Sequence, residues 1–350
     1  MTTLVIGDIH GCWDELRDLL DKAALGQDDQ IVAVGDLIDR GPQPGKVLDF
    51  FGQTPNARTV MGNHERKHVR WRRGEVKPSL GQKIARRQLG QPGWEAACNA
   101  METMPLWIEL PWAIVVHGFF EPGVALEKQN PSVLLGTMTG ERHMKAHGGR
   151  QWYERYDGDK PLIVGHLQYT TDHSALVHNE RVFGLDTGAS HGGRLTGLLL
   201  PQMRLISVPS RGDHWARVKA DHADLRYTGT ALEDLDWEGL ERLVRRADAD
   251  QSPHPDALER INALRRLHRR AHLAIEALHE HILTRTQALI EQDPSRAQDG
   301  GAFARALGPE PMASFYHLAR RGALSPQNVH QRFATPLQAV NAALERGLDV

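Results

Sequence analysis

Short apolar segments of this chain repeatedly end in clusters of Gly, Asp, Asn and His, and this pattern constrains the fold most. Residues 2–6 are typical of a buried strand, which breaks at the sequence GDIHG of residues 7–11. A spacing typical of a helix then begins at Trp13. Asp8 and His10 are two residues apart, so a strand-like backbone sends both side chains to the same side. A carboxylate and an imidazole placed in this way form half of a metal site.

Four more strand candidates end in clusters of the same kind. Residues 31–34 lead into GDLIDRG (35–41), and residues 58–61 lead into GNHE (62–65). Residues 113–116 end in HG (117–118), and residues 162–164 end in GH (165–166). Open α/β sheets bind ligands beyond the carboxyl ends of their strands, so we expect all five clusters to meet at one edge of one sheet.

Together the clusters supply six metal-binding side chains, namely Asp8, His10, Asp36, Asn63, His117 and His166. Hard divalent ions such as Mn²⁺ accept this mixture of carboxylate, amide oxygen and imidazole. An aspartate shared by two ions lets them lie about 3.5–4 Å apart, and water held between them becomes a nucleophile near neutral pH. The side chains of His64 and Arg40 have the chemistry to protonate a leaving oxygen and to bind phosphoryl oxygens.

The ordered set GDIHG, GDLIDRG, GNHE, HG and GH resembles the calcineurin-like metallophosphoesterases. It is closest to the phosphoprotein-phosphatase branch, which includes phage-type Ser/Thr phosphatases and symmetric bis(5'-nucleosyl)-tetraphosphatases. The resemblance covers about residues 1–208 and implies a four-layer α-β-β-α sandwich. It also implies that Asp8 and His10 bind one metal ion and that Asp36 bridges to a second. The second ion would be held by Asn63, His117 and His166.

The same resemblance implies that His64 is the general acid, that Asp39 orients it, and that Arg40 holds the phosphate. The phosphoprotein phosphatases commonly have a second phosphate-binding arginine, for which Arg142 and Arg150 in the irregular segment 121–159 are candidates. The two ions are expected to be Mn²⁺, with Fe, Zn and Mg as alternatives. One departure is that the family's HGG is here HGF, at residues 117–119.

Other histidines and both cysteines favour structural roles. The chain has only two cysteines, Cys12 and Cys98, so a disulfide framework is excluded. Both are interpreted as small buried hydrophobic residues. His268 and His272 have a helical spacing that can bind a metal, but their arginine-rich surroundings favour a solvated helix face. Four further histidines are expected to be surface or loop groups, namely His143, His147, His173 and His191.

A length of 350 residues predicts two domains. Residues 1–210 form the catalytic α/β domain, and residues 211–350 form a helical region whose role the sequence leaves open between a lid, a dimer contact and a partner-binding surface. A long amphipathic helix is expected over about residues 258–282, after a Ser252-Pro253 start. Shorter helices are expected at residues 303–307, 312–320 and 337–344. Four arginines in the long helix could contact nucleic acid, although a solvated face is favoured: Arg265, Arg266, Arg269 and Arg270.

Composition limits the partners of the chain. Lys and Arg total 42 against 44 Asp and Glu, for a net charge of -2, so the whole chain implies no polyelectrolyte partner. No apolar segment approaches the ~20 residues that cross a bilayer, and the start lacks a signal peptide pattern. We therefore expect a cytoplasmic protein with no membrane partner; its oligomeric state stays open.

The sequence predicts a dinuclear-metal phosphohydrolase, in which a metal-bridged hydroxide attacks a phosphate ester. A Ser/Thr-phosphatase-like phosphomonoesterase is the first expectation. The alternatives are a symmetric dinucleoside-tetraphosphate hydrolase and a nucleic-acid-end phosphatase or phosphodiesterase. A phosphoprotein, a nucleotide or a nucleic-acid end is thus the expected substrate. A non-catalytic scaffold on the same fold is disfavoured, because the whole ligand set and the acid are present.

Overall fold

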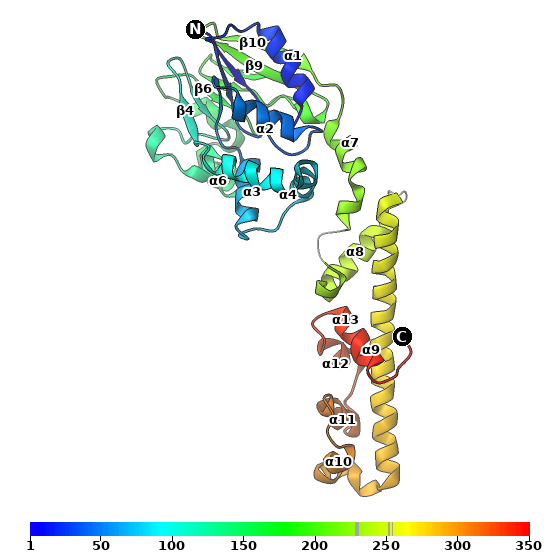
Figure 1. The fold of residues 1–350 in the computed structure, drawn as a ribbon. Coiled ribbons are helices and arrows are strands. Elements are labelled where there is room, and N and C mark those ends of the chain that lie inside the picture. Colours follow the sequence, from blue (N-terminus) through cyan, green and yellow to red (C-terminus); the bar gives the residue numbers. More distant parts are fainter. Residues whose placement is uncertain (228–230, 251–252, 254) are drawn as a thin grey trace. The chain divides into compact units, whose positions relative to one another are not determined.

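The computed structural model describes residues 1–227, 231–250, 253 and 255–350. The chain divides into two compact units, Met1–His222 and Ala223–Val350 (Figure 1). The helix α7 (His214–Asp221), which follows the boundary expected at residue 210, belongs to the first unit. The Ser252 expected to start the long helix lies outside the described residues.

The first unit holds a five-stranded sheet in the order β10-β9-β1-β2-β3. The pairs β1–β2 and β2–β3 are parallel, whereas β9 pairs antiparallel with β1 and β10. All four residues of β1 are buried, as its continuous apolar sequence predicts. The strands are β1 (Thr3–Ile6), β2 (Gln30–Ala33), β3 (Ala57–Thr59), β9 (Arg194–Leu200) and β10 (Arg204–Pro209).

A second five-stranded sheet follows the order β4-β5-β6-β8-β7, with β5, β6 and β8 parallel to one another. Its strands are β4 (Trp107–Glu109), β5 (Ile114–Val116), β6 (Leu162–Val164), β7 (Leu176–His178) and β8 (Val182–Gly184). The expectation of one sheet with one ligand-binding edge is therefore wrong. Strands buried on both faces look alike in sequence, and only their pairing partners assign them to one sheet or the other.

The two sheets pack face to face between helices. Val5 and Val32 of the first sheet share a buried core with Ile163 and Phe183 of the second. On the outer face of the first sheet, α1 (Trp13–Ala23) buries Leu16 against the strands, beside α2 (Pro44–Gln53). A further core lies on the second sheet's outer face and includes residues of the segment 121–159. This arrangement confirms the predicted four-layer α-β-β-α sandwich.

The segment 121–159, expected to be irregular, contains short helices. Two of them have side-chain N-caps: Asn130 accepts the N–H of Ser132, and Thr137 accepts that of Gly140. Helices this short cannot be predicted from a Gly- and His-rich sequence that has no apolar periodicity. The helices are α5 (Pro131–Leu134) and α6 (Met138–Met144), with 3-10 turns η1 (Leu126–Lys128), η2 (Lys145–His147) and η3 (Gly149–Arg155). Another 3-10 turn, η4 (Ala189–His191), follows β8.

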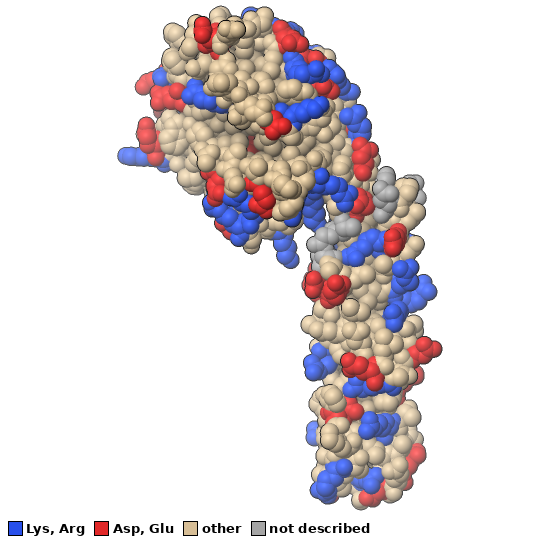
Figure 2. Space-filling view, viewed as in Figure 1, with Lys and Arg blue, Asp and Glu red and all other residues tan. Residues whose placement is uncertain are grey.

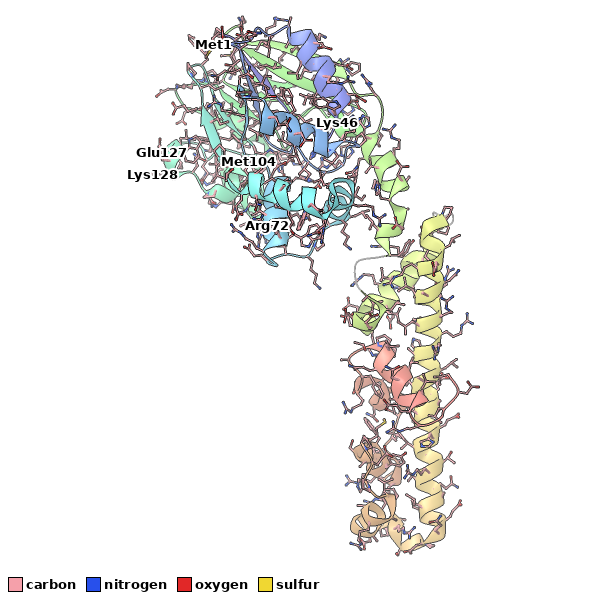
Figure 3. The ribbon with its side chains drawn as sticks, in the orientation of Figure 1. Met1, Lys46, Arg72, Met104, Glu127 and Lys128 are labelled. Atoms are coloured by element: carbon pink, nitrogen blue, oxygen red, sulfur yellow. The ribbon has the colours of Figure 1, made fainter. Side chains whose placement is uncertain are left out.

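Helices α3 (Asn63–Arg72) and α4 (Leu80–Glu102) pack together and carry part of the site. Arg72 of α3, which is labelled in Figure 3, contacts Asn99 and Glu102 of α4. Helix α4 is kinked at Gly90, where φ is 68°. Lys and Arg side chains gather over the α3 side of this unit in Figure 2.

The second unit is helical and has its own hydrophobic core, which includes Leu264, Tyr316 and Val340. The long helix predicted at 258–282 runs from Pro255 to Gln292, and the three shorter predicted helices are present. Acidic and basic side chains are mixed over its surface (Figure 2), and Arg265 pairs with Asp248. Among the described residues, no helix is both long and apolar enough to cross a membrane. The elements are α8 (Trp237–Ala249), α9 (Pro255–Gln292), α10 (Gly300–Leu307), α11 (Ala313–Arg320), α12 (Pro326–Gln331) and α13 (Pro336–Leu344), with η5 (Ala223–Arg226), η6 (Leu232–Asp234) and η7 (Pro294–Ala297).

Candidate metal centre

Both sheets contribute side chains to one buried polar centre. Asp8 and His10 follow β1, and Asp36 follows β2. Asn63 begins α3 shortly after β3, whereas His117 and His166 follow β5 and β6 of the second sheet. The parallel strands of the two packed sheets thus direct their carboxyl ends to the same region.

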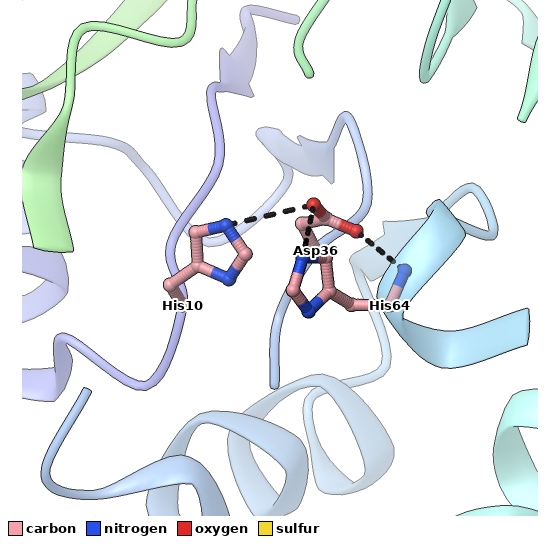
Figure 4. Close-up of side chains that lie close together, drawn as sticks. All are labelled: His10, Asp36 and His64. Carbon is pink, nitrogen blue, oxygen red and sulfur yellow. Dashed lines mark hydrogen bonds and ion pairs between the residues drawn. The ribbon is translucent and has the colours of Figure 1, made fainter. Parts of the chain in front are cut away.

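Asp36 lies between two histidines that belong to different sheets. Its Oδ2 is 3.5 Å from Nε2 of His10, and its Oδ1 is 3.5 Å from Nε2 of His117. Asn63 Oδ1 is 3.1 Å from the same nitrogen of His117, and Asp8 Oδ2 is 4.0 Å from Nε2 of His10. Figure 4 shows that the rings of His10 and His64 both approach Oδ2 of Asp36, while the backbone N–H of His64 donates to Oδ1. Asp36 therefore has one oxygen directed to each of two groups of metal-binding atoms.

Hydrogen bonds to backbone carbonyls fix which ring nitrogen of each histidine is free. His10 Nδ1 is 2.9 Å from the carbonyl oxygen of Ile38, and His117 Nδ1 is 2.9 Å from that of Val34. A carbonyl only accepts, so each Nδ1 is protonated and each Nε2 has a lone pair facing Asp36. Nε2 of His10 is buried without a hydrogen-bond partner. This is the tautomer and the orientation that a metal-binding histidine requires.

His166 joins the centre through its backbone and its ring. Its backbone N–H donates to Asp8 at 3.0 Å, and its ring centroid is 5.2 Å from that of His117. A Cβ on Gly165 would lie 2.1 Å from Asp8 Oδ1, so glycine is needed there for this close approach. Burial, and then the neighbouring His117 ring, lower the pKa of His166 to about 3. Its ring is therefore neutral at neutral pH and can bind a metal.

The centre contains three buried carboxylates, those of Asp8, Asp36 and Asp186, whose mutual repulsion would be relieved by bound cations. Burial, and then the charges of Asp186 and Asp36, raise the pKa of Asp8 well above its ordinary value. Burial and the charge of Arg40 lower the pKa of His10. Clustered buried negative charges are stabilised when cations lie between them. The donor set of carboxylates, an amide oxygen and neutral imidazoles therefore fits divalent metal ions.

Five residues of the motifs have positive φ angles: His10 (48°), Asp36 (51°), Asp39 (71°), Arg40 (65°) and His166 (69°). This backbone conformation costs about 1–3 kcal/mol for a residue other than glycine, and such strain collects at functional sites. Short sequence motifs with several strained positions need a surrounding structure that holds them in place.

His64, Asp39 and Arg40 form a second group beside Asp36. His64 Nδ1 is 2.6 Å from Asp39 Oδ2, and His64 Nε2 is 3.1 Å from Nη2 of Arg40. The side chain of His64 is 19% exposed, and its Nε2 lies between Arg40 and Asp36 Oδ2, which is 3.9 Å away. Burial opposes the charged ring, but Asp36 and the bond with Asp39 outweigh burial and raise the pKa of His64. The group therefore combines a proton donor with a cation.

The sequence reasoning missed the part played by Glu65. Its carboxylate accepts backbone N–H groups from Asp36 (2.9 Å), Leu37 (2.8 Å) and Gly62 (2.9 Å), and a longer one from Ile38 (3.3 Å). Burial and the charge of Asp36 raise the pKa of Glu65 to about 7. The capping-box position of Glu65, third in α3, was the available signal.

Other candidate residues lie at the surface of the segment 121–159. Arg142 is exposed on α6 and its Nε donates to the carbonyl of Met138 at 3.3 Å, while Arg150 is exposed on η3. Their phosphate-binding roles stay predictions. His143 Nε2 lies 2.7 Å from Oε1 of Glu121.

The remaining predicted groups have structural surroundings. Cys12 and Cys98 are free thiols and are buried, as expected. On α9, the rings of His268 and His272 lie 4.6 Å apart between their centroids.

Comparisons with known proteins agree with this geometry. A family model described as Calcineurin-like phosphoesterase matches residues 1–191. The protein named bis(5'-nucleosyl)-tetraphosphatase PrpE [asymmetrical] of Halalkalibacterium halodurans is 31% identical over 235 residues, covering 59% of this chain and 93% of the relative. The protein of the same name from Bacillus mycoides is 30% identical over 241 residues, with the same two coverages.

The chain is also similar to a solved structure. A proposed diadenosine tetraphosphatase is 25% identical and gives a TM-score of 0.48, covering 60% of this chain and 93% of the other. The family match spans more than half of the 350 residues and contains all six expected metal ligands. The chain therefore belongs to the calcineurin-like phosphoesterase family of metal-dependent phosphoester hydrolases.

Proposed function

We propose that this chain is a dinuclear-metal phosphohydrolase that cleaves dinucleoside tetraphosphates asymmetrically. The observation that supports two ions is the Asp36 carboxylate, which directs one oxygen to His10 and the other to His117. Nδ1 of each histidine is bonded to a backbone carbonyl, so Nε2 is the ring atom that faces Asp36. An ion held between His10 and Oδ2 of Asp36 would leave a second group of ligand atoms, namely Asp36 Oδ1, His117 Nε2 and Asn63 Oδ1, with no cation between them.

Each ion would have its own set of ligands, with one residue in common. When bound, the two ions supply the positive charge that activates water and that stabilises the phosphoryl oxygens. We infer Mn²⁺, with Fe, Zn and Mg as alternatives, because all accept these donors. The first ion would be held by Asp8, His10 and Asp36, and the second by Asp36, Asn63, His117 and His166.

The residues beside the ions would bind and protonate the substrate. The Arg40 guanidinium, 3.1 Å from the His64 ring, would bind phosphoryl oxygens. His64 would donate the proton on Nε2 to the leaving oxygen while its Nδ1–H stays bonded to Asp39. Asp36 and Asp39 favour the protonated ring that this role requires.

The catalytic part of the proposal is tested with p-nitrophenyl phosphate and Mn²⁺. Removing the metal with EDTA should abolish hydrolysis, and re-adding Mn²⁺ should restore it. Asp36→Asn should lower kcat at least about 100-fold, because the variant lacks the shared carboxylate. The matched control is Asp28→Asn, at an exposed turn, which should retain activity. Full activity of Asp36→Asn would contradict the metal assignment.

The substrate is supported by the shared name of the relatives, which specifies asymmetrical cleavage of a bis(5'-nucleosyl)-tetraphosphate. A second candidate substrate is a phosphate monoester on a protein, which the GDLIDRG and GNHE sequences favour. Product analysis with diadenosine tetraphosphate separates the possibilities. ATP and AMP would support asymmetrical cleavage, whereas two molecules of ADP would indicate symmetrical cleavage. Faster hydrolysis of a phosphoserine peptide would instead favour the monoesterase.

A further inference from the structure

A buried chain of hydrogen bonds extends from His64 away from the metal centre. Asp39 Oδ2 contacts His64 Nδ1 at 2.6 Å, and Asp39 Oδ1 contacts His68 Nε2 at 2.9 Å. His68 Nδ1 in turn lies 3.0 Å from the indole Nε1 of Trp94. Asp39, His68 and Trp94 are 1%, 0% and 3% exposed, so water does not replace any of these bonds. The motif resemblance assigned no role to His68 or Trp94.

Hydrogen-bond chemistry determines which group donates in each bond of this series. The indole N–H of Trp94 can only donate, so His68 Nδ1 must be an acceptor. The single ring proton of His68 is therefore on Nε2 and is donated to Asp39. As a result, each oxygen of the Asp39 carboxylate accepts an N–H from a different histidine. The second histidine leaves Asp39 no freedom to turn away from His64.

The surrounding aromatic side chains hold Trp94 in place. The ring of Trp71, on α3, lies 4.8 Å from that of Trp94, on α4, between centroids. The Arg86 guanidinium lies 4.7 Å from the Trp94 ring and 5.1 Å from the Trp71 ring, within cation–π distance. The indole N–H is therefore presented to His68 by a packed contact between two helices, rather than by a mobile side chain.

We propose that His68 is a positioning residue: Trp94 fixes its tautomer, and its Nε2–H fixes the Asp39 carboxylate that orients His64. Asp39 needs this support because its backbone has a φ of 71° and it lies in a strained turn rather than in a helix or strand. General acids contribute about 10²–10⁴-fold to a rate, and small misplacements of a reacting group lose much of this. The inference rests on the proposed function, because it requires His64 to protonate a leaving group.

A purely structural role for His68 would give a different result from a positioning role. Loss of a general acid slows esters with basic leaving groups far more than esters whose leaving group departs unprotonated. Phenyl phosphate needs the proton, whereas p-nitrophenyl phosphate needs it little. The ratio of kcat for these two substrates therefore reports the position of His64. A general loosening of the fold would slow both substrates equally and leave the ratio unchanged.

The experiment compares His68→Leu with wild type on both esters, using the full chain with Mn²⁺. We expect kcat on phenyl phosphate to fall about 10-fold or more relative to kcat on p-nitrophenyl phosphate, with KM nearly unchanged. His68→Gln should restore most of the ratio, because its side-chain amide can donate to Asp39 from nearly the same position. Trp94→Phe should shift the ratio in the same direction as His68→Leu, by less.

Trp71→Phe is the matched control, because it alters the same aromatic contact without removing the N–H donor to His68. It should leave the ratio at the wild-type value. Trp94→Phe also tests the inference independently if His68→Leu does not fold. An unchanged ratio in Trp94→Phe and in folded His68→Leu, with active wild type, would overturn this inference alone. A wild type inactive on both esters would overturn the proposed function as well.

Discussion

Glu65 supports the metal centre without being placed among its ligands. Its two carboxylate oxygens hold the backbone that follows β2, where Asp36 has a left-handed conformation. A Cβ on Gly62 would lie 2.2 Å from Asp36 Oδ1 and 2.6 Å from Glu65 Oε2. The first residues of the GNHE motif thus leave room for the Asp36 loop while its last residue binds that loop. This explains in physical terms why the two motifs occur together.

The substitution Glu65→Gln should destabilise the first unit. Oε2 of Glu65 accepts the N–H groups of Asp36 and Gly62, and Oε1 accepts those of Leu37 and Ile38. A side-chain NH₂ group in place of either oxygen would face two N–H donors. We expect a loss of about 1–3 kcal/mol in the free energy of unfolding, measured by urea denaturation.

The matched control for this change is Glu75→Gln, because Glu75 is exposed and pairs with Arg70 at the surface. Its free energy of unfolding should change by less than about 0.5 kcal/mol. Equal unfolding midpoints for Glu65→Gln and wild type would contradict the role assigned to Glu65.

Among the helices, α7 is attached to α1 by a buried hydrogen bond between His214 and Glu15. His214 Nε2 lies 2.7 Å from Glu15 Oε1, and the backbone N–H of Arg211 donates to the same oxygen at 2.8 Å. Both side chains are buried, at 5% and 1% exposure. The sequence predicted a helical region from residue 211 but not this contact, because residues 15 and 214 are far apart along the chain.

The environment of Glu15 should make stability depend on pH. Burial opposes ionisation of Glu15, but the bonds from His214 and Arg211 outweigh it and hold the pKa of Glu15 below its ordinary 4.5. As the pH falls below about 4.5, the unfolded chain binds this proton first, so the native state loses stability. The advantage of wild type over Glu15→Gln should therefore be full above that pH and shrink on acidification.

Urea unfolding of wild type and Glu15→Gln between about pH 6 and pH 3 measures this difference, since titrating groups distant from Glu15 contribute equally to both proteins. The matched control is Glu127→Gln, at an exposed position on η1 (Figure 3). A stability difference between wild type and Glu15→Gln that is independent of pH would contradict the prediction.

At the scale of the whole molecule, each unit has its own buried core. The described core of the helical unit draws only on residues 227–343, and those of the first unit draw only on residues 4–208. The family match also lies entirely within the first unit. Separate cores are the usual property of domains that can fold alone.

A fragment of residues 1–222 should therefore fold and hydrolyse p-nitrophenyl phosphate. A fragment of residues 1–210 lacks α7 and leaves Glu15 without its His214 partner. We expect a lower Tm for the shorter fragment, by about 2–4 °C for each kcal/mol lost. Differential scanning calorimetry measures both. Equal Tm values would favour a domain boundary at residue 210, and aggregation of both fragments would contradict independent folding.

The sequence by itself determined the strands, the motifs that follow them and the chemistry of each side chain. These depend on local apolar patterns and on residue types, so Asp8, His64 and the GDLIDRG motif could be identified without coordinates. Only the tertiary structure decided that His117 and His166 reach Asp36 from a second sheet. It alone also showed that Glu65 binds the backbone of the Asp36 loop and that His68 and Trp94 extend the hydrogen bonds from Asp39. Contacts between residues distant in sequence leave no periodic signal, because they depend on how sheets and helices pack.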